Sequence, residues 1–77
     1  MKENAKTEAE AIELAKRIAL EQGWGWVEPA EAIWHPAWFG NGGKWEVYSN
    51  AKGLGAKARV VIDAQTGEVL EQGYVPR

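Results

Sequence analysis

The 77-residue chain contains no cysteine, and histidine, serine and aspartate each occur only once. The absence of cysteine excludes disulfide bonds, thiolate zinc sites and cysteine nucleophiles. No apolar run approaches the roughly 18 residues that a membrane-spanning helix needs. Nine basic and eleven acidic residues are interspersed, so the basic stripe that is typical of nucleic-acid binding is missing. These features predict a single small domain, residues 1–77, with no nucleic-acid partner and no membrane span.

The first ten residues are charged and lack the apolar stretch of a signal peptide. As it stands, the chain is therefore expected to be cytoplasmic. If an export signal had been removed from it, the protein would instead be an exported one. The sequence therefore leaves both the cytoplasm and export as alternatives.

A Ser-His-Asp triad would have to use Ser49, His35 and Asp63. Asp63 begins the turn Asp63–Gly67, where an aspartate usually accepts hydrogen bonds from backbone amides. A metal site would depend on His35 and carboxylates, and no ligand spacing supports one. The sequence therefore predicts no catalytic residues, no metal and no cofactor.

Glu28 and Glu31 flank Pro29 and are the one carboxylate pair that suggests a glycosidase. Two glutamates beside a turn are more often solvated than catalytic. We therefore expect that this pair is not catalytic and that the protein is not an enzyme.

The N-terminal part has the pattern of an amphipathic helix. Thr7 and Glu10 match a capping box. An apolar stripe with three- and four-residue spacing follows, made of Ala11, Leu14, Ala15, Ile18 and Ala19. Gly23 is suited to the position just after a helix. The pattern predicts a helix over about residues 7–22, and its small alanines favour close packing on a sheet.

The remainder is typical of strands joined by turns, with strands expected over about residues 31–39, 44–50, 57–63 and 68–75. Pro36 limits the first of these to an edge or irregular strand. Turns are expected at residues 40–43 and 63–67, where glycines allow positive φ. This order predicts an α+β fold in which one N-terminal helix packs on a three- to four-stranded antiparallel meander.

Five tryptophans are many for this length. The helix stripe is made of small residues, so large side chains are expected to fill the space above the sheet. We expect three tryptophans in the core and one or two partly exposed near the hairpin end. Alternatively, exposed tryptophans could stack on sugars, single-stranded bases or a peptide.

The segment Arg59-Val-Val-Ile-Asp-Ala-Gln-Thr-Gly-Glu-Val-Leu70 resembles the C-terminal hairpin of PepSY domains, with an apolar strand, then Asp-Ala-x-Thr-Gly, then Glu-Val-Leu. Glu10-Ala-Ile-Glu-Leu-Ala15 resembles the first helix of that family, and Lys44-Trp-Glu-Val-Tyr48 its middle strand. The same order of elements is similar to small bacterial immunity proteins with a cystatin-like or nuclear-transport-factor-like fold. The resemblance extends over about residues 7–72 and implies that the α+β fold is cystatin-like or PepSY-like.

The resemblance to PepSY domains implies a non-catalytic bacterial domain that inhibits a peptidase or regulates another partner. PepSY domains are usually exported or tethered to a membrane, and the tryptophan-rich segment of this chain is not part of their pattern. The Gln-x-Val-x-Gly hairpin of cystatins is absent, which disfavours protease inhibition through such a hairpin.

Alternation across the turn at residues 40–43 assigns side chains to two sheet faces. One set is expected to meet the helix: Trp34, Trp38, Trp45 and Val47. Another is expected on the opposite face: Ile33, Phe39 and Tyr48. The last hairpin adds to that face either Val61 with Leu70 or Val60 with Ile62 and Val69.

One helix covers one face, so an apolar patch on the second face predicts a docking surface. We expect it to bind a protein partner or a second copy of the chain. The candidate partner-binding residues are Ile33, Trp38, Phe39, Tyr48, Val61 and Leu70. The alternative is that Lys and Arg stems cover this face and the protein is a monomer. A toxin-neutralising immunity protein and an aromatic-rich carbohydrate-binding module are the alternative functions.

Overall fold

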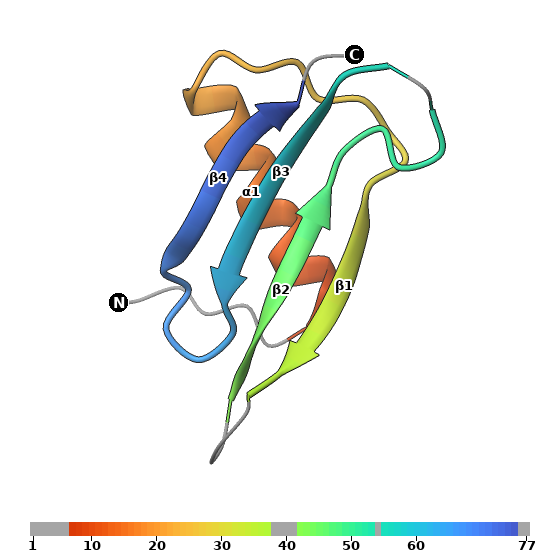
Figure 1. The fold of residues 1–77 in the computed structure, drawn as a ribbon. Coiled ribbons are helices and arrows are strands. Elements are labelled where there is room, and N and C mark those ends of the chain that lie inside the picture. Colours follow the sequence, from red (N-terminus) through yellow and green to blue (C-terminus); the bar gives the residue numbers. More distant parts are fainter. Residues whose placement is uncertain (1–6, 38–41, 54, 76–77) are drawn as a thin grey trace.

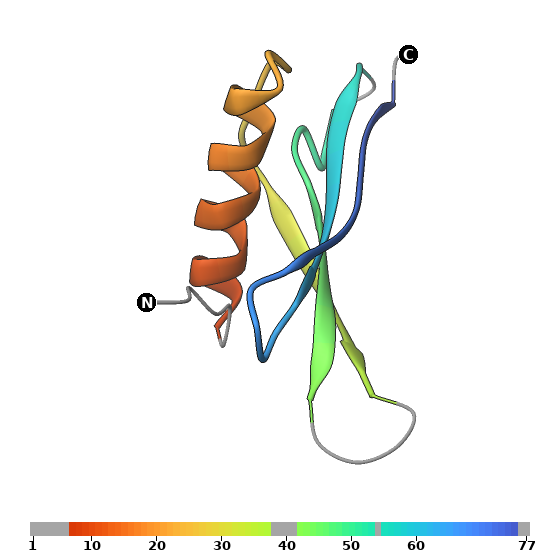
Figure 2. The same ribbon diagram turned by 90° about the vertical axis from the view of Figure 1, so that its left-hand side faces the viewer.

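A computed structural model describes residues 7–37, 42–53 and 55–75 of the chain. One helix, α1 (Glu8–Glu21), precedes four strands: β1 (Glu31–Pro36), β2 (Gly43–Tyr48), β3 (Lys57–Asp63) and β4 (Val69–Val75). The strands form one antiparallel sheet in the order β1-β2-β3-β4. Helix α1 lies on one face of this sheet, and the other face has no helix (Figures 1 and 2). The α+β fold expected from the sequence is confirmed.

The start of α1 is fixed by its capping box. The Thr7 hydroxyl accepts a hydrogen bond from the Glu10 backbone N–H at 3.1 Å, and the Glu10 carboxylate accepts one from the Thr7 backbone N–H at 3.1 Å. These two bonds satisfy amides that have no partner within the helix. After the helix, Gly23 adopts a φ of 80°, which turns the chain toward β1.

The core is a thin layer of small and β-branched side chains between α1 and the sheet. Fully buried alanines of α1 meet three fully buried sheet residues, Val47, Val60 and Ile62. Alanine has no side chain beyond Cβ, so the helix backbone approaches the sheet closely. This approach leaves room for valine and isoleucine between the two layers, but not for several indole rings.

The expectation of three tryptophans in the core is therefore wrong. None of the four described tryptophans is fully buried: Trp26 and Trp45 are partly buried and pack against the core. Trp34 is 43% exposed, and its ring lies 4.9 Å from that of Trp45 between centroids. Trp24 stacks on Tyr74 with centroids 6.0 Å apart. The rings line the margins of the core and do not fill it.

The register of the last hairpin shows which of its apolar residues face the helix. The register pairs Val60 with Val47 and Ile62 with Val69, and all four pack in the core layer. Val61 is opposite Glu46 and Glu71 and therefore belongs to the other face. Between Val61 and Ile62 the register shifts, because Leu70 is an extra residue that has no partner in β3.

The Asp63–Gly67 turn closes this hairpin. One Asp63 carboxylate oxygen accepts hydrogen bonds from the backbone N–H groups of Gln65 at 2.8 Å and Thr66 at 3.0 Å. Gly67 has a φ of 75°, which confirms the positive φ predicted for it, and its N–H donates to the Asp63 carbonyl at 2.8 Å.

The backbone of β4 lies farther from α1 than those of the other three strands, although the C-terminal half of α1 passes behind β4 in Figure 1. Helix α1 packs over β1, β2 and β3, and within the described residues none of its Cα atoms lies within 8 Å of a Cα atom of β4. Figure 1 shows β4 at one edge of the sheet, beside β3 alone. The end of β4 contacts the segment after the helix, through the stacking of Trp24 on Tyr74.

Candidate interaction surface

The sheet face that points away from α1 is called the open face below. By strand register and alternation it carries side chains from all four strands: Ile33, His35, Lys44, Glu46, Tyr48, Arg59, Val61 and Glu71. Figure 2 shows this face free of any helix along the length of the sheet. Its shape and charge are therefore set by side chains alone.

A chain of hydrogen-bonded charged groups crosses the open face, and Glu46 is at its centre. The Glu46 Oε1 atom lies 3.0 Å from His35 Nε2, and Oε2 accepts hydrogen bonds from Tyr48 OH and Arg59 Nε, both at 2.8 Å. The Arg59 Nη1 atom donates to Glu71 Oε1 at 3.1 Å. These five residues, called the charged cluster below, connect β1 to β4.

The surroundings of Glu46 hold it in the ionised form. Its hydrogen bonds from Tyr48, His35 and Arg59 lower the pKa of the carboxyl from 4.5 to about 2, against the opposing effect of its partial burial. The pKa of Arg59 is raised above its usual range, first by the bond to Glu71 and then by the bond to Glu46. Glu46 and Arg59 are therefore both charged near neutral pH, and Glu46 is not a proton donor there.

Val61 lies beneath this cluster and is only 2% exposed. The charged stems of Arg59 and Lys44 and the His35 ring surround it, together lining an open hollow of about 150 Å³ above it. The expectation that Val61 contributes to an accessible apolar patch is corrected, because a charged layer covers it. The alternation of residues in the sequence correctly places Val61 on the open face, but it does not show which side chains cover Val61.

The accessible apolar side chains of the open face are at its margins. Ile33 on β1 is 43% exposed, and Leu70 on β4 is 46% exposed. Tyr48 is partly buried and its hydroxyl belongs to the charged cluster. Trp38 and Phe39, which the sequence also indicated as candidates, lie outside the described residues. Val75, which pairs with Lys57 at the end of β4, is 51% exposed on the same face. Three exposed apolar residues thus lie around a polar centre, in place of the continuous apolar patch expected.

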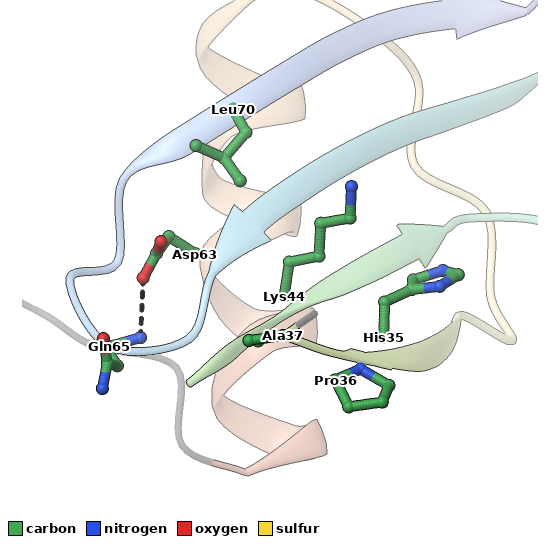
Figure 3. Close-up of a pocket in the computed structure, with 8 residues that line it drawn as sticks. His35, Pro36, Ala37, Lys44, Asp63, Gln65 and Leu70 are labelled. Atoms are coloured by element: carbon green, nitrogen blue, oxygen red, sulfur yellow. Dashed lines mark hydrogen bonds between the residues drawn. The ribbon is translucent and has the colours of Figure 1, made fainter. Parts of the chain in front are cut away.

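An open hollow of about 400 Å³ occupies the end of the open face near the turns. It is lined by His35, Pro36, Ala37, Gly43, Lys44, Asp63, Gln65 and Leu70, from all four strands and the segments next to them (Figure 3). The Asp63 carboxylate in it is bonded to the turn backbone. Lys44 has no ion-pair partner among the described residues, so its ammonium group is available to a ligand.

A second hollow, of about 250 Å³, lies at the other end of the face and is lined by Glu31, Ile33, Tyr48, Ala51 and Lys57. Here the ammonium group of Lys57 is already used, since it donates to the carbonyls of Asn50 at 2.7 Å and Gly53 at 3.0 Å. Lys57 therefore fixes the loop after β2, and Ile33 is the apolar group that this hollow presents.

The residues considered for catalysis are not brought together. Ser49 is buried, and its hydroxyl accepts a hydrogen bond from the Ala58 N–H at 2.9 Å. His35 pairs with Lys44, five residues along β2 from Ser49, or about 17 Å at the rise of a strand. Glu28 accepts a hydrogen bond from Trp26 Nε1 at 2.7 Å. Within the described residues, no group of three or more His, Cys, Asp or Glu side chains is placed to hold a metal ion.

The charged cluster is the feature that sequence reasoning missed. His35, Glu46, Arg59 and Glu71 are on four different strands, and only the register brings them together. The signal for it in the sequence was an excess of charged residues at alternate positions of the strands. This pattern indicates a polar face, but it does not show which charged residues pair with one another.

Comparison with known proteins gives no match to a family model, to a curated protein or to a solved structure. In the part of the chain that the structure describes, no helix has the length and apolar character needed to cross a membrane. The residues of the open face are therefore the features that indicate a function.

Proposed function

We propose that the protein is a non-catalytic binding module that docks a protein partner on its open face. The observation that carries this proposal is an uncovered sheet face with an ordered charged cluster at its centre and exposed Ile33 and Leu70 at its margins. Arginine, tyrosine and large apolar residues are the types that contribute most to protein interfaces. A surface of this kind supplies both apolar anchors and specific hydrogen bonds.

The order of the cluster favours binding. Arg59 is held between Glu46 and Glu71 before any partner arrives, so less side-chain entropy is lost on docking. The outer members remain accessible, since the side chains of His35 and Glu71 are 43% and 57% exposed. Lys44 adds a cation that can pair with an acidic group of the partner.

A foreign partner fits this face better than a second open face does. In a face-to-face dimer, each copy would bury its own Glu46 and Glu71 carboxylates against a surface of the same kind. Burial of ionised groups without new partners is unfavourable. A foreign protein can supply groups complementary to both charges, and a self-dimer through this face remains an outcome of the test.

The resemblance to PepSY domains supports a regulatory role of this kind, with a peptidase or another protein as the partner. A toxin-neutralising immunity protein would use the same surface and differ only in what it binds. A carbohydrate-binding module is favoured by a different observation, the 43% exposure of Trp34, whose ring could stack on a sugar.

The test compares three variants with similar changes on opposite sides of the molecule. Ile33→Asp and Leu70→Asp alter the open face, and Leu20→Asp alters an equally apolar residue of α1 that is 57% exposed. Binding of a partner, captured with the wild-type protein and then purified, is measured by titration with each variant. Circular dichroism establishes that each variant is folded.

The proposal expects Ile33→Asp and Leu70→Asp to weaken binding at least about tenfold, and Leu20→Asp to bind like the wild type. Equal binding by the wild type and both open-face variants would exclude this surface. A concentration-dependent dimer that the open-face variants abolish would replace the foreign partner with a second copy. Binding to a glycan array that Trp34→Ala removes would support the carbohydrate alternative.

A further inference from the structure

The outer edge of β4 is a surface distinct from the open face. Within the described residues β4 pairs only with β3, so the backbone groups along its other edge have no strand partner. Within the described residues no Cα atom of α1 lies within 8 Å of β4, and on the helix side the end of β4 is contacted by Trp24, whereas no helix covers its other side. Tyr74 and Val75 are 40% and 51% exposed along its regular part. An uncovered edge strand is a template on which another strand can pair.

The two edges of the sheet are not equivalent. β1 ends in Pro36, which has no N–H to offer a further strand, and β1 lies under α1. β4 contains neither proline nor lysine, the residues that most often block edge pairing. Its bulge at Leu70 interrupts only the start of the strand, and residues 71–75 keep a regular register with residues 57–61. The regular half of β4 is thus the unprotected edge.

Gly73 is the midpoint of this regular segment, and nothing in the described part of the chain requires a glycine there. A Cβ atom built at Gly73 would meet no atom within 4 Å, and its φ is not in the left-handed region. Glycine inside a strand weakens the strand and often marks the close approach of another backbone. No such backbone is present in the described chain, which points to one from outside.

We propose that two copies of this chain pair antiparallel through the edges of β4, around a two-fold axis at Gly73. The result is one continuous eight-stranded sheet with both helices on the same side. In this register Gly73 faces Gly73 of the second copy, Gln72 faces Tyr74, and Glu71 faces Val75. Glu71 is the only charged residue of β4, so the pairing opposes no like charges.

The paired sheet places both helices on one side. Helix α1 contacts β1, β2 and β3, and it runs diagonally across the sheet, so that its C-terminal half passes behind β4 in Figure 1. Both open faces then point to the same side, and the dimer presents two docking surfaces together.

The edge is short, so the dimer is expected to be weak and dependent on concentration. Five regular residues form a much smaller contact than the roughly 800 Å² per partner of a standard interface. Sedimentation velocity of the wild-type chain over a concentration series is therefore expected to show a monomer that shifts toward a dimer at high concentration.

A disulfide trap tests the two-fold axis directly, because the chain has no cysteine of its own. Opposed residues in antiparallel strands have Cα atoms about 4.5–5.5 Å apart, which is within the range that a disulfide spans. Gly73→Cys is therefore expected to form a covalent dimer under mild oxidation, several times faster than Gly25→Cys. Gly25 is a matched control, since it is exposed and a Cβ there also meets no atom within 4 Å.

A charge test at Val75 examines the register. Val75→Lys places an ammonium group opposite Glu71 of the second copy, and Val75→Glu places a second carboxylate there. Two cross-strand pairs change in each dimer, so the dissociation constant is expected to fall for Val75→Lys and rise for Val75→Glu, each by about threefold to tenfold. Both effects are expected to shrink at high salt.

The proposal is overturned if the wild type stays monomeric at every concentration and Gly73→Cys cross-links no faster than Gly25→Cys. It is also overturned if Val75→Lys and Val75→Glu shift the dissociation constant in the same direction. A dimer that is insensitive to all these edge variants and is lost in Ile33→Asp would assign self-association to the open face instead. Circular dichroism and the thermal midpoint of each variant show whether the fold is retained.

Discussion

The Arg59 Nε atom lies 2.8 Å from the Glu46 Oε2 atom, although the register places Arg59 opposite Tyr48 and Glu46 opposite Val61. The ion pair therefore runs diagonally across β2 and β3. Val61 is the direct cross-strand neighbour of Glu46 and lies beside this diagonal, so the side chains of the ion pair extend next to it. This geometry explains how a valine on a face without a helix is shielded from water.

The protonation of Glu46 is expected to destabilise the fold in acid. Its pKa is about 2 in the folded protein and near 4.5 without its partners. A lowered folded-state pKa adds stability that is fully present above pH 4.5 and is lost as the pH falls toward 2. The shift corresponds to about 3 kcal/mol at 1.4 kcal/mol per unit, and solvent screening reduces the expected effect to about 1–2 kcal/mol. Urea unfolding at pH 7, 4 and 2.5 measures it.

Glu46→Gln separates this effect from general acid sensitivity. The variant is expected to be less stable than the wild type at pH 7, and the difference should narrow as the pH falls toward 2. Glu71→Gln is the matched control, because the Glu71 side chain is 57% exposed and makes one bond to Arg59. A constant difference between wild type and Glu46→Gln across the pH range would contradict the assigned pKa.

Three isoleucines provide a graded test of the core. Ile62 is fully buried, Ile18 is partly buried against the core, and Ile33 is 43% exposed on the open face. Truncation to alanine is expected to cost about 2–5 kcal/mol at Ile62, about 1–2 kcal/mol at Ile18 and less than about 1 kcal/mol at Ile33. Chemical denaturation of the three variants gives these values, and any other order would mean that the layers pack differently.

Gly67 is expected to resist replacement by a β-branched residue. Its φ of 75° lies in the left-handed region, which valine adopts only with strain. Gly67→Val should lower the free energy of unfolding by about 1 kcal/mol or more, and Gly67→Asn by less, because asparagine tolerates this conformation. Gly25→Val serves as the control in a loop without positive φ. Equal losses in the free energy of unfolding for Gly67→Val and Gly25→Val would contradict the turn conformation assigned to Gly67.

The Thr7 cap is expected to contribute to the stability of α1. Thr7→Ala removes the hydroxyl that accepts from the Glu10 N–H and should cost about 0.5–2 kcal/mol. Thr7→Ser keeps an equivalent oxygen and should retain most of the wild-type stability. Thermal unfolding followed at 222 nm compares the two, and a loss of the same size in both would show that the hydroxyl bond is not the cause.

Features that depend on a few neighbouring residues could be predicted from the sequence. Thr7 and Glu10 are three residues apart and form the capping box, and Asp63 and Gly67 form a turn within five residues. The periodic alanines identify the helix and its buried side. These local patterns are sufficient to predict the order of the elements and the α+β class.

Features that depend on distances between elements could not be predicted in this way. The tryptophans were expected in the core because the gap between helix and sheet was unknown, and buried Ala15 shows that the gap is narrow. The cluster around Glu46 requires the pairing of four strands and the one-residue shift at Leu70. A local pattern contains neither the register nor the bulge, so the open face was expected to be apolar.

The greater distance of β4 from α1 has a consequence for how the molecule opens. β1, β2 and β3 pack closely against the helix, whereas β4 is held by its ladder with β3, by the packing of Val69 against the core and by the contact of Tyr74 with Trp24. Detachment of β4 therefore exposes less apolar surface than global unfolding does, and its free energy is correspondingly lower. Amide hydrogens of β4 should exchange with solvent through this partial opening, while those between β2 and β3 exchange only when the whole domain unfolds. β4, whose outer edge is the unprotected one, is thus also the strand expected to open at a lower free energy than the rest of the domain.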